Sequence, residues 1–281
     1  MQTVSKELTP FKELWHIARG YSDKRTAWWF GKLSAIQSQQ LSSSIDNWHK
    51  ALSSLKTYSN LNQYEKPGIM LNFIFKEIDD IKSFLPIVDR LRAKGLEKRH
   101  FVEMSNLLGV NVDPTCLTLT DIKLKKLYMG ETLEAIKNVS GVAFKENSIR
   151  IAIDAIDNEY KAIRLECQPY KEQPVQVITN CDAVLQSLDE SLIKLQAIKG
   201  NEFAKFQADR IIKIERDIKF LQGNFESWTR VQKAWIYLET IYTQDDVAEN
   251  LPEQKRIFDD VNFKFRNMMK INVVSEYTMI V

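Results

Sequence analysis

Histidines are the first residues of this sequence whose side chains could hold a metal ion, and their spacing does not favour it. His16, His49 and His100 each lie in a different predicted helix, without a second histidine, cysteine or carboxylate at ligand spacing. A lone histidine is a weak signal for a metal site. We therefore assign the three histidines to structural or surface roles and predict no metal ligand in this chain.

Adjacent carboxylates could indicate general acid–base chemistry, and several such pairs occur. Among them are Asp79-Asp80, Asp245-Asp246 and Asp259-Asp260. Neighbouring residues on a helix do not face each other, so the two carboxylates of a pair cannot act on one substrate atom. We interpret all three pairs as solvated helix faces and helix starts.

The three cysteines, Cys116, Cys167 and Cys181, are far apart and form no Cys-x-x-Cys pair. An odd number of dispersed cysteines predicts neither a disulfide framework nor a zinc site. We interpret them as reduced thiols of a cytosolic protein.

A phosphate-binding loop requires Gly-x4-Gly-Lys-Ser/Thr, because its backbone amides and its lysine contact the phosphates. The only Gly-Lys pair, Gly31-Lys32, is followed by Leu33, and Thr26 stands where the first glycine is needed. The glycines form no dinucleotide-binding pattern after a strand either. We predict no catalytic residue and no cofactor in this chain, so we do not expect it to be an enzyme by itself.

The composition indicates a folded protein that is mainly helical. The chain has 281 residues, of which 44% are hydrophobic, and it contains only 9 glycines and 7 prolines. Residues that lose little freedom in a helix are abundant, and the length exceeds that of one small core. We predict an all-α fold, an elongated stack of antiparallel helical bundles with long helices, and at most one small β-hairpin near residues 166–179.

The charge balance argues against nucleic-acid and membrane partners. The chain has 39 basic and 37 acidic residues, a net charge of +2, so no global field attracts it to polyanions. The basic clusters Arg90-Lys98-Arg99 and Lys123-Lys125-Lys126 are short and interleaved with acidic residues. A local protein-docking patch at these clusters stays open. No secretory signal or bilayer-length apolar run is visible.

Breaks in the helical periodicity divide the chain into three predicted bundles, 1–66, 67–168 and 169–281. Turn signals at Pro67-Gly68 and around Pro169 mark the two boundaries. In the first bundle we expect a break between Gly20 and Asp23, and in the second a kink at Pro86. We also expect a helix starting after Gly141 and ending near Leu165.

The third bundle is predicted to contain one very long helix, from about residue 201 to 242, and a final helix from Leu251 to about Met269. The remaining residues, 271–281, form an apolar tail, so we expect a chain cut at its C-terminus. The tryptophans Trp28, Trp29, Trp228 and Trp235 all fall on apolar stripes. We interpret them as core anchors rather than interface hot spots.

A block near the C-terminus carries a family resemblance. The run Trp228–Glu239 reads W-T-R-V-Q-K-A-W-I-Y-L-E, and Leu251-Pro252 follows it. It resembles the W-x-x-x-Q-x-x-W-x-Y-L-E block and the later L-P-x-E of the linker of dynein heavy chains. Leu85-Pro86 and Arg99-His100 are similar to further segments of that family. The residues that carry the resemblance are Leu85, Pro86, Arg99, His100, Trp228, Gln232, Trp235, Tyr237, Leu238, Glu239, Leu251 and Pro252.

The sequence departs from the family pattern at Phe101, where tryptophan is usual, and at Gln254, where an acid is usual. The C-terminal part from Asp245 resembles axonemal more than cytoplasmic members. These departures concern docking details and leave the predicted fold unchanged.

The resemblance implies a mechanical role inside a longer motor polypeptide. The chain would lie N-terminal to a ring of AAA+ modules, dock on that ring and swing across it. ATP and magnesium would bind in the ring, outside this chain. Implied partners are the ring, the dynein tail and its intermediate and light chains, in the cytoplasmic cytoskeleton, above all the ciliary axoneme. The residues that dock on the ring are not identified, and we expect a hinge near Pro67, Gly109 or Pro169.

The alternative is a non-motor helical scaffold or adaptor that binds protein partners through its bundle faces. No triple-helical repeat of fixed period is visible, which argues against a spectrin-like version. A third class, an α-helical enzyme, would require measurable ATP hydrolysis by the isolated chain.

Overall fold

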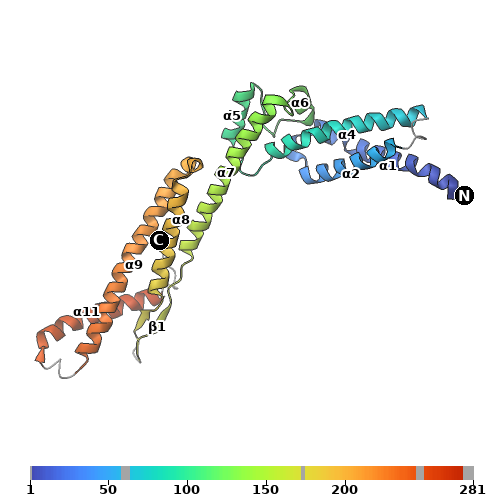
Figure 1. Ribbon diagram of the computed structural model, residues 1–281. Coiled ribbons are helices and arrows are strands. Elements are labelled where there is room, and N and C mark those ends of the chain that lie inside the picture. The colour runs from blue at the N-terminus through green and yellow to red at the C-terminus, as the bar shows by residue number, and fades with distance from the viewer. Residues whose placement is uncertain (1, 58–63, 172–174, 245–249, 275–281) are drawn as a thin grey trace. The chain divides into compact units, whose positions relative to one another are not determined.

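The computed structural model describes residues 2–57, 64–171, 175–244 and 250–274, with the side chains of all these except 2–7 and 270–274 (Figure 1). The predicted all-α class with one small hairpin is confirmed. The chain forms two compact units, an N-terminal unit of residues 1–147 and a C-terminal unit of residues 148–281. Each unit has its own cluster of buried apolar side chains.

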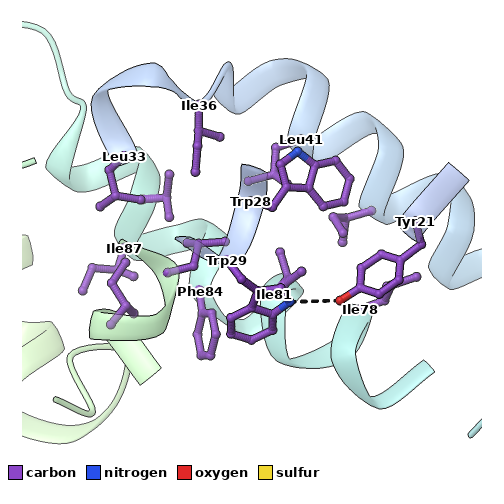
Figure 2. Packing of buried hydrophobic residues seen from close by; sticks show 14 of the residues in the cluster. Tyr21, Trp28, Trp29, Leu33, Ile36, Leu41, Ile78, Ile81, Phe84 and Ile87 are labelled. Carbon is purple, nitrogen blue, oxygen red and sulfur yellow. Dashed lines mark hydrogen bonds between the residues drawn. The ribbon is translucent and has the colours of Figure 1, made fainter. Parts of the chain in front are cut away.

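Three long helices form the body of the N-terminal unit. They are α1 (Gln2–Phe30), α2 (Ser38–Lys56) and α4 (Glu65–Leu91). The short helix η1 (Leu33–Ala35) connects the first two. Figure 2 shows how aromatic and aliphatic side chains of α1, α2 and α4 interlock, among them Trp28, Leu41 and Phe84. Most residues of the apolar stripes in the sequence meet in this cluster, whereas Trp15 and Phe73 are 57% and 52% exposed.

The remaining elements of the unit are α5 (Lys98–Leu108), α6 (Leu119–Leu124) and the first part of α7 (Gly130–Lys161). Local sequence signals mark a boundary of two of these helices, a glycine after α5 and a threonine before α6. Gly109 follows α5 with φ 65°, the left-handed conformation that glycine adopts without strain. Thr118 caps α6 through a reciprocal pair of hydrogen bonds with Asp121.

The predicted break between Gly20 and Asp23 is wrong, because α1 runs without interruption through both residues. A Cβ at Gly20 would lie 3.1 Å from the Trp48 ring. The glycine therefore makes room for a tryptophan of α2 instead of ending the helix. Sequence alone cannot separate these two uses of glycine.

The turn signal at Pro67-Gly68 also differs from the prediction. Pro67 and Gly68 lie in the first turn of α4, where the first backbone N–H groups have no intrahelical acceptor, so a missing N–H costs little. The residues predicted to form a turn, Pro67 and Gly68, are therefore part of the start of a helix. Pro86 lies inside the same helix, which continues to Leu91.

Helix α7 is longer at its N-terminal end than predicted. It starts at Gly130, whose φ is 61°, and passes through Gly141. A Cβ added at Gly141 or Gly130 would meet no atom within 4 Å, so packing explains neither glycine. The helix ends at Lys161, four residues before the predicted end.

Besides the second part of α7, the described residues of the C-terminal unit form the predicted hairpin and three further α-helices. Strands β1 (Cys167–Pro169) and β2 (Gln176–Ile178) pair antiparallel, with Cys167 opposite Ile178. The helices are α8 (Cys181–Lys199), α9 (Ala208–Tyr242) and α11 (Pro252–Val274).

The predicted helix over 201–242 begins later than expected, because residues Glu202–Gln207 form the 3₁₀ helix η2. The 35 residues of α9 span about 52 Å at 1.5 Å per residue. Helix α11 extends five residues beyond the predicted end at Met269, and residues 275–281 lie outside the described part.

The border between the two units lies inside α7, after Asn147. The predicted borders near residues 67 and 169 fall within the units, and the division into three bundles stays a prediction. Of the four tryptophans interpreted as core anchors, Trp28, Trp29 and Trp235 are buried, and Trp228 is partly buried against the C-terminal cluster.

Candidate functional site

Four residues of the tryptophan-containing block share one face of α9. Trp228, Gln232, Trp235 and Glu239 follow one another at steps of four, three and four residues, which keeps them on a single helix face. Gln232 is 5% exposed, and Trp235 and Glu239 are each 1% exposed. A buried glutamine and a buried glutamate on this face need polar partners, because an unpaired buried polar group is costly.

Gln232 pairs with the backbone of the hairpin. The N–H of Ile178 donates to Gln232 Oε1 at 2.9 Å, and Gln232 Nε2 donates to the carbonyl of Ile178 at 2.8 Å. The side-chain amide thus takes the place of a neighbouring strand for the outer edge of β2. This contact fixes the hairpin to the C-terminal third of α9.

Glu239 binds the turn side of the same hairpin. Its Oε2 accepts hydrogen bonds from Lys171 Nζ at 2.6 Å and from the Tyr170 hydroxyl at 3.2 Å. The bonds to Glu239 and Tyr170 raise the pKa of Lys171 above its usual range. Lys171 has φ 51°, a left-handed conformation that is uncommon for a lysine.

Trp235 joins the hairpin and α11. Its ring stacks on Phe265 at a centroid distance of 4.4 Å, and Tyr170 meets it edge-on at 5.1 Å. Its indole N–H donates to Asn262 Oδ1 at 3.1 Å. Trp228 stacks on the same Phe265 at 6.0 Å. Ring stacking and the hydrogen bond from Trp235 to Asn262 therefore hold α11 to α9.

The other residues of the block and of its downstream motif have different environments. Leu238 is partly buried against the core, whereas Tyr237 is 68% exposed. Pro252 is the first residue of α11, where a backbone N–H would have no acceptor within the helix, so proline is tolerated. Leu251 before it is 43% exposed. The structure shows no core role for Tyr237 or Leu251.

Two motif residues of the N-terminal unit, Arg99 and His100, meet at a carboxylate that no sequence pattern indicates. Arg99 Nη2 lies 2.6 Å from Glu146 Oε2, and His100 Nε2 lies 3.0 Å from the same oxygen. Both bonds tie the start of α5 to α7. Glu146 was missed because 46 residues separate it from His100, and only the fold brings them together.

The hydrogen bonds of His100 define its role. The backbone N–H of Glu97 donates to Nδ1 at 3.0 Å, so Nδ1 carries no proton and Nε2–H faces Glu146. His100 is 3% exposed and completes a capping box with the Glu97 side chain. Both ring nitrogens of His100 thus have hydrogen-bond partners within the N-terminal unit.

Leu85 and Pro86 lie near the C-terminal end of α4. Leu85 is partly buried against the N-terminal cluster, and Pro86 is exposed. Among the described residues, neither side chain is part of a polar cluster.

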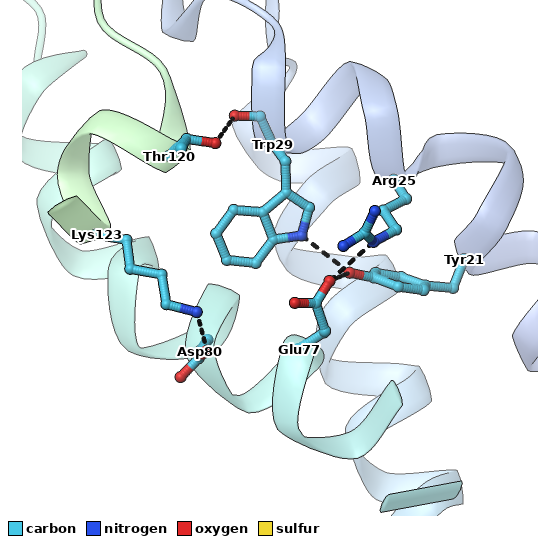
Figure 3. Close-up of polar contacts among 7 residues, drawn as sticks. All are labelled: Tyr21, Arg25, Trp29, Glu77, Asp80, Thr120 and Lys123. Carbon is cyan, nitrogen blue, oxygen red and sulfur yellow. Dashed lines mark hydrogen bonds and ion pairs between the residues drawn. The ribbon is translucent and has the colours of Figure 1, made fainter. Parts of the chain in front are cut away.

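A second polar cluster, shown in Figure 3, was not predicted from the sequence. The Tyr21 hydroxyl donates to Glu77 Oε2 at 2.8 Å and accepts from Trp29 Nε1 at 2.9 Å. Arg25 Nε contacts the same Glu77 oxygen at 2.9 Å. Burial raises the pKa of Tyr21 above its usual range. The cluster joins α1 to α4 and satisfies polar groups inside the packed face.

The remaining candidate groups are dispersed. Among the described residues, no three or more histidine, cysteine, aspartate or glutamate side chains are grouped so that they could hold a metal ion. Asp79 faces His49 and Asp80 binds Lys123, while Asp259 and Asp260 pair with lysines of their own helix. Asp245 and Asp246 lie outside the described residues. No helix in the described part of the chain is both long and apolar enough to cross a membrane.

Comparison with known proteins places the whole chain in one family. The family model described as "Dynein heavy chain, N-terminal region 2" matches residues 1–279. Mouse (Mus musculus) dynein axonemal heavy chain 1 is 27% identical over 289 residues, covering 100% of this chain and 7% of the relative. Human (Homo sapiens) dynein axonemal heavy chains 3 and 2 are each 25% identical over 270 residues, covering 96% of this chain and 6% of each relative.

The chain thus spans well under a tenth of the length of these relatives, all of which are axonemal. The match extends over almost every residue, including both units and the tryptophan-containing block. This chain therefore belongs to the dynein heavy chain family, in which it corresponds to the N-terminal region 2.

Proposed function

We propose that this chain is the mechanical linker of a dynein motor, which docks on the AAA+ ring and swings across it to couple ATP hydrolysis to movement along microtubules. Family membership supports a dynein motor component. The observation that carries the mechanical role is the way α9 is fixed to its neighbours. Three side chains on one face of this 35-residue helix bind the hairpin and α11 at successive points.

Stiffness follows from these contacts. A lever must keep its shape under load, and an isolated helix bends where nothing supports it. Gln232, Trp235 and Glu239 lie within two turns and use hydrogen bonds and ring stacking, which are directional. The end of α9 that carries the block is thereby supported on one face by β2 and α11.

The chemistry of the motor belongs elsewhere in this proposal. ATP and magnesium bind in the AAA+ ring of the parent polypeptide, which is the direct partner of this chain. The tail with its intermediate and light chains receives the movement. The axonemal relatives support a place in the ciliary or flagellar axoneme.

We propose that the chain bends at one of the three candidate hinges, Pro67, Gly109 or Pro169. Gly109 is the best candidate of the three. Pro67 lies in the first turn of α4 and Pro169 in strand β1. Gly109 lies between α5 and α6, outside any helix or strand, and a Cβ there would meet no atom within 4 Å. A glycine without a Cβ can adopt a wide range of dihedral angles, which suits a hinge.

A crosslink across Gly109 in the full heavy chain tests this. The backbone N–H of Val112 donates to Ser105 Oγ at 3.2 Å, so the two sides of the break are adjacent. Ser105→Cys and Asn111→Cys, bridged by a short bismaleimide in a Cys116→Ser background, would hold the break closed. We expect microtubule gliding to stop while basal ATP turnover continues.

The matched control is the same bridge between Gln186→Cys and Glu190→Cys, whose parent side chains already bond within α8 at 3.0 Å. It should leave gliding unchanged. If bridges across all three breaks leave gliding unchanged, the proposed hinge is wrong.

A further inference from the structure

The turn between α4 and α5 carries more positive than negative charge. Residues 89–99 contain five basic and two acidic side chains. Four of the basic residues are exposed to solvent, and we call these four the basic turn: Arg90, Arg92, Lys94 and Lys98. In the described part of the chain, none of them forms an ion pair with a carboxylate.

The backbone of this turn is held against α7. Gly95 has φ 97°, and a Cβ at this position would lie 2.4 Å from Asn147 Cβ. Leu96 is partly buried against the N-terminal cluster. At the start of α5, His100 binds Glu146 of α7 at 3.0 Å. The turn is therefore ordered before any partner binds, which lowers the entropic cost of binding.

Few carboxylates oppose the basic turn. Glu97 is bound to Arg99 at 3.0 Å, and the Asp113 carboxylate accepts two hydrogen bonds within its own loop. Asp89 lies next to the turn in α4. Glu103 follows the first residue of α5 by five positions, so it points to another side of that helix. The four exposed cations thus outnumber the carboxylates around them, and the local charge is positive.

Local electrostatics explain only some of these cations. Arg90 and Arg92 lie at the C-terminal end of α4, where a positive charge is favourable next to the free carbonyl groups. Lys98 is the first residue of α5, where a positive charge is unfavourable beside the free N–H groups. A residue that breaks a local preference without a compensating contact is expected at a functional surface.

We propose that the basic turn docks on an acidic surface of the AAA+ ring of the same heavy chain. This chain covers 7% of mouse dynein axonemal heavy chain 1, so most of such a polypeptide lies outside it. A surface tethered to the turn by the same polypeptide has a high effective concentration, and it outcompetes a free acidic protein. The inference rests on the proposed function, which supplies the ring as the partner, and it adds the residues that dock.

Carbodiimide crosslinking of the full heavy chain tests this contact. The reagent activates a carboxylate, and a lysine amine at ion-pair distance displaces the urea, forms an amide and loses a proton. We expect mass spectrometry to find Lys94 or Lys98 joined to an aspartate or glutamate of the ring in at least one nucleotide state. The yield should fall as salt rises. Lys233, an exposed lysine of α9, serves as the reference and should give a lower yield of crosslinks to the ring.

Charge reversal sharpens the test. In the Arg90→Glu/Arg92→Glu variant the yield of the Lys98 crosslink should fall at least about tenfold, because like charges then face each other. The matched control, Arg230→Glu/Lys233→Glu, reverses the same number of exposed charges on α9 and should leave this yield unchanged.

Glutamates at the end of α4 also oppose the helix dipole, so a second variant is needed. Arg90→Gln/Arg92→Gln removes the charges without reversing them and should give an intermediate yield. Circular dichroism of each variant checks that the helices are retained.

Three results overturn the proposal. They are crosslinks of Lys94 and Lys98 only to carboxylates outside the ring, a yield that neither arginine variant lowers, and crosslinks between isotope-labelled and unlabelled heavy chains, which would place the partner on a second copy. The proposed function fails differently. If the bridge at Gly109 stops gliding but no ring crosslink forms, only the basic turn is rejected. If the ring crosslink forms but neither the bridges nor the arginine variants affect gliding, the contact stands and the lever is rejected.

Discussion

Gln232 shows how one polar side chain can define a junction. It lies on the apolar stripe of α9, where a leucine would bury more apolar surface. The outer edge of β2, however, presents the N–H and carbonyl of Ile178 to this position. A glutamine satisfies both groups at once, because its amide has a donor and an acceptor at fixed geometry.

Replacing Gln232 should therefore destabilise the C-terminal unit. The Gln232→Ala change leaves two buried backbone groups without partners, each at about 1–3 kcal/mol. We expect a loss of at least about 2 kcal/mol in the free energy of unfolding, measured by urea denaturation. Gln222→Ala, on the same helix but bound to the exposed Asp189 carboxylate, should change it by less than about 0.5 kcal/mol. Equal effects of the two changes would refute the bridging role of Gln232.

Glu215 provides a pH-dependent prediction. Hydrogen bonds from Lys199 at 2.8 Å and Lys219 at 2.6 Å lower the pKa of Glu215 from 4.5 to about 2. Because the pKa of Glu215 is lower in the folded than in the unfolded chain, these contacts stabilise the fold fully at pH values above the unfolded-state pKa. Their contribution to the free energy of unfolding disappears as the pH falls through about 2.

Carbon-detected NMR titration of the Glu215 carboxyl measures this directly. The Lys199→Ala/Lys219→Ala double variant should raise the pKa of Glu215 toward its ordinary value, since both cations are then gone. Glu226 serves as the internal reference, because its carboxylate accepts from Gln222 and pairs with no lysine among the described residues. An unchanged pKa of Glu215 in the double variant would exclude the lysines as the cause.

Among the elements, the glycines show that one residue type has different effects at different positions. Gly20 admits the Trp48 ring, and Gly95 has φ 97° with α7 directly beside it. A Cβ on Gly95 would lie 2.4 Å from Asn147 Cβ and 2.9 Å from the carbonyl oxygen of Ala143. Gly141 has open space around it in the middle of α7.

Alanine at these positions should thus act in opposite directions. Gly95→Ala adds backbone strain and a steric clash with α7, for an expected loss of about 2–4 kcal/mol. Gly141→Ala removes backbone freedom from the unfolded chain and should stabilise by about 0.5–1 kcal/mol. Thermal unfolding followed by circular dichroism checks both changes. A neutral Gly95→Ala would mean that α7 can shift away at little cost.

At the scale of the whole molecule, the chain has two hydrophobic clusters. The N-terminal cluster contains Ile81 and Phe84, and the C-terminal cluster contains Ile218 and Trp235. Each unit encloses its own cluster, so each has the main source of its stability within itself.

Unfolding should then occur in two steps. Ile81→Ala and Ile218→Ala each remove buried methyl groups from one cluster, at about 2–5 kcal/mol. In differential scanning calorimetry we expect each change to lower the midpoint of one transition and leave the other near its original temperature. A single transition that both changes lower equally would show that the units unfold as one.

Sequence was sufficient wherever the signal is local. The helical class, the cap at Thr118, the glycine after α5 and the hairpin depend on residues close together in the chain, whose conformational preferences act before any tertiary contact. The block from Trp228 to Glu239 was recognisable through its resemblance to a dynein heavy chain pattern. Its helical spacing indicated a seam between helices, but not the contacts that its residues make.

Only the tertiary structure decided what those residues contact. Glu146 meets His100 across 46 residues and Glu77 meets Tyr21 across 56, and no local pattern announces either partner. For the same reason Gly20 and Pro67 do not act as the predicted breaks, since their effect depends on a tryptophan ring from α2 and on the position within a helix turn. Local preference determines where helices can form, whereas burial of one face against another determines which polar groups must meet and which glycines must stay small.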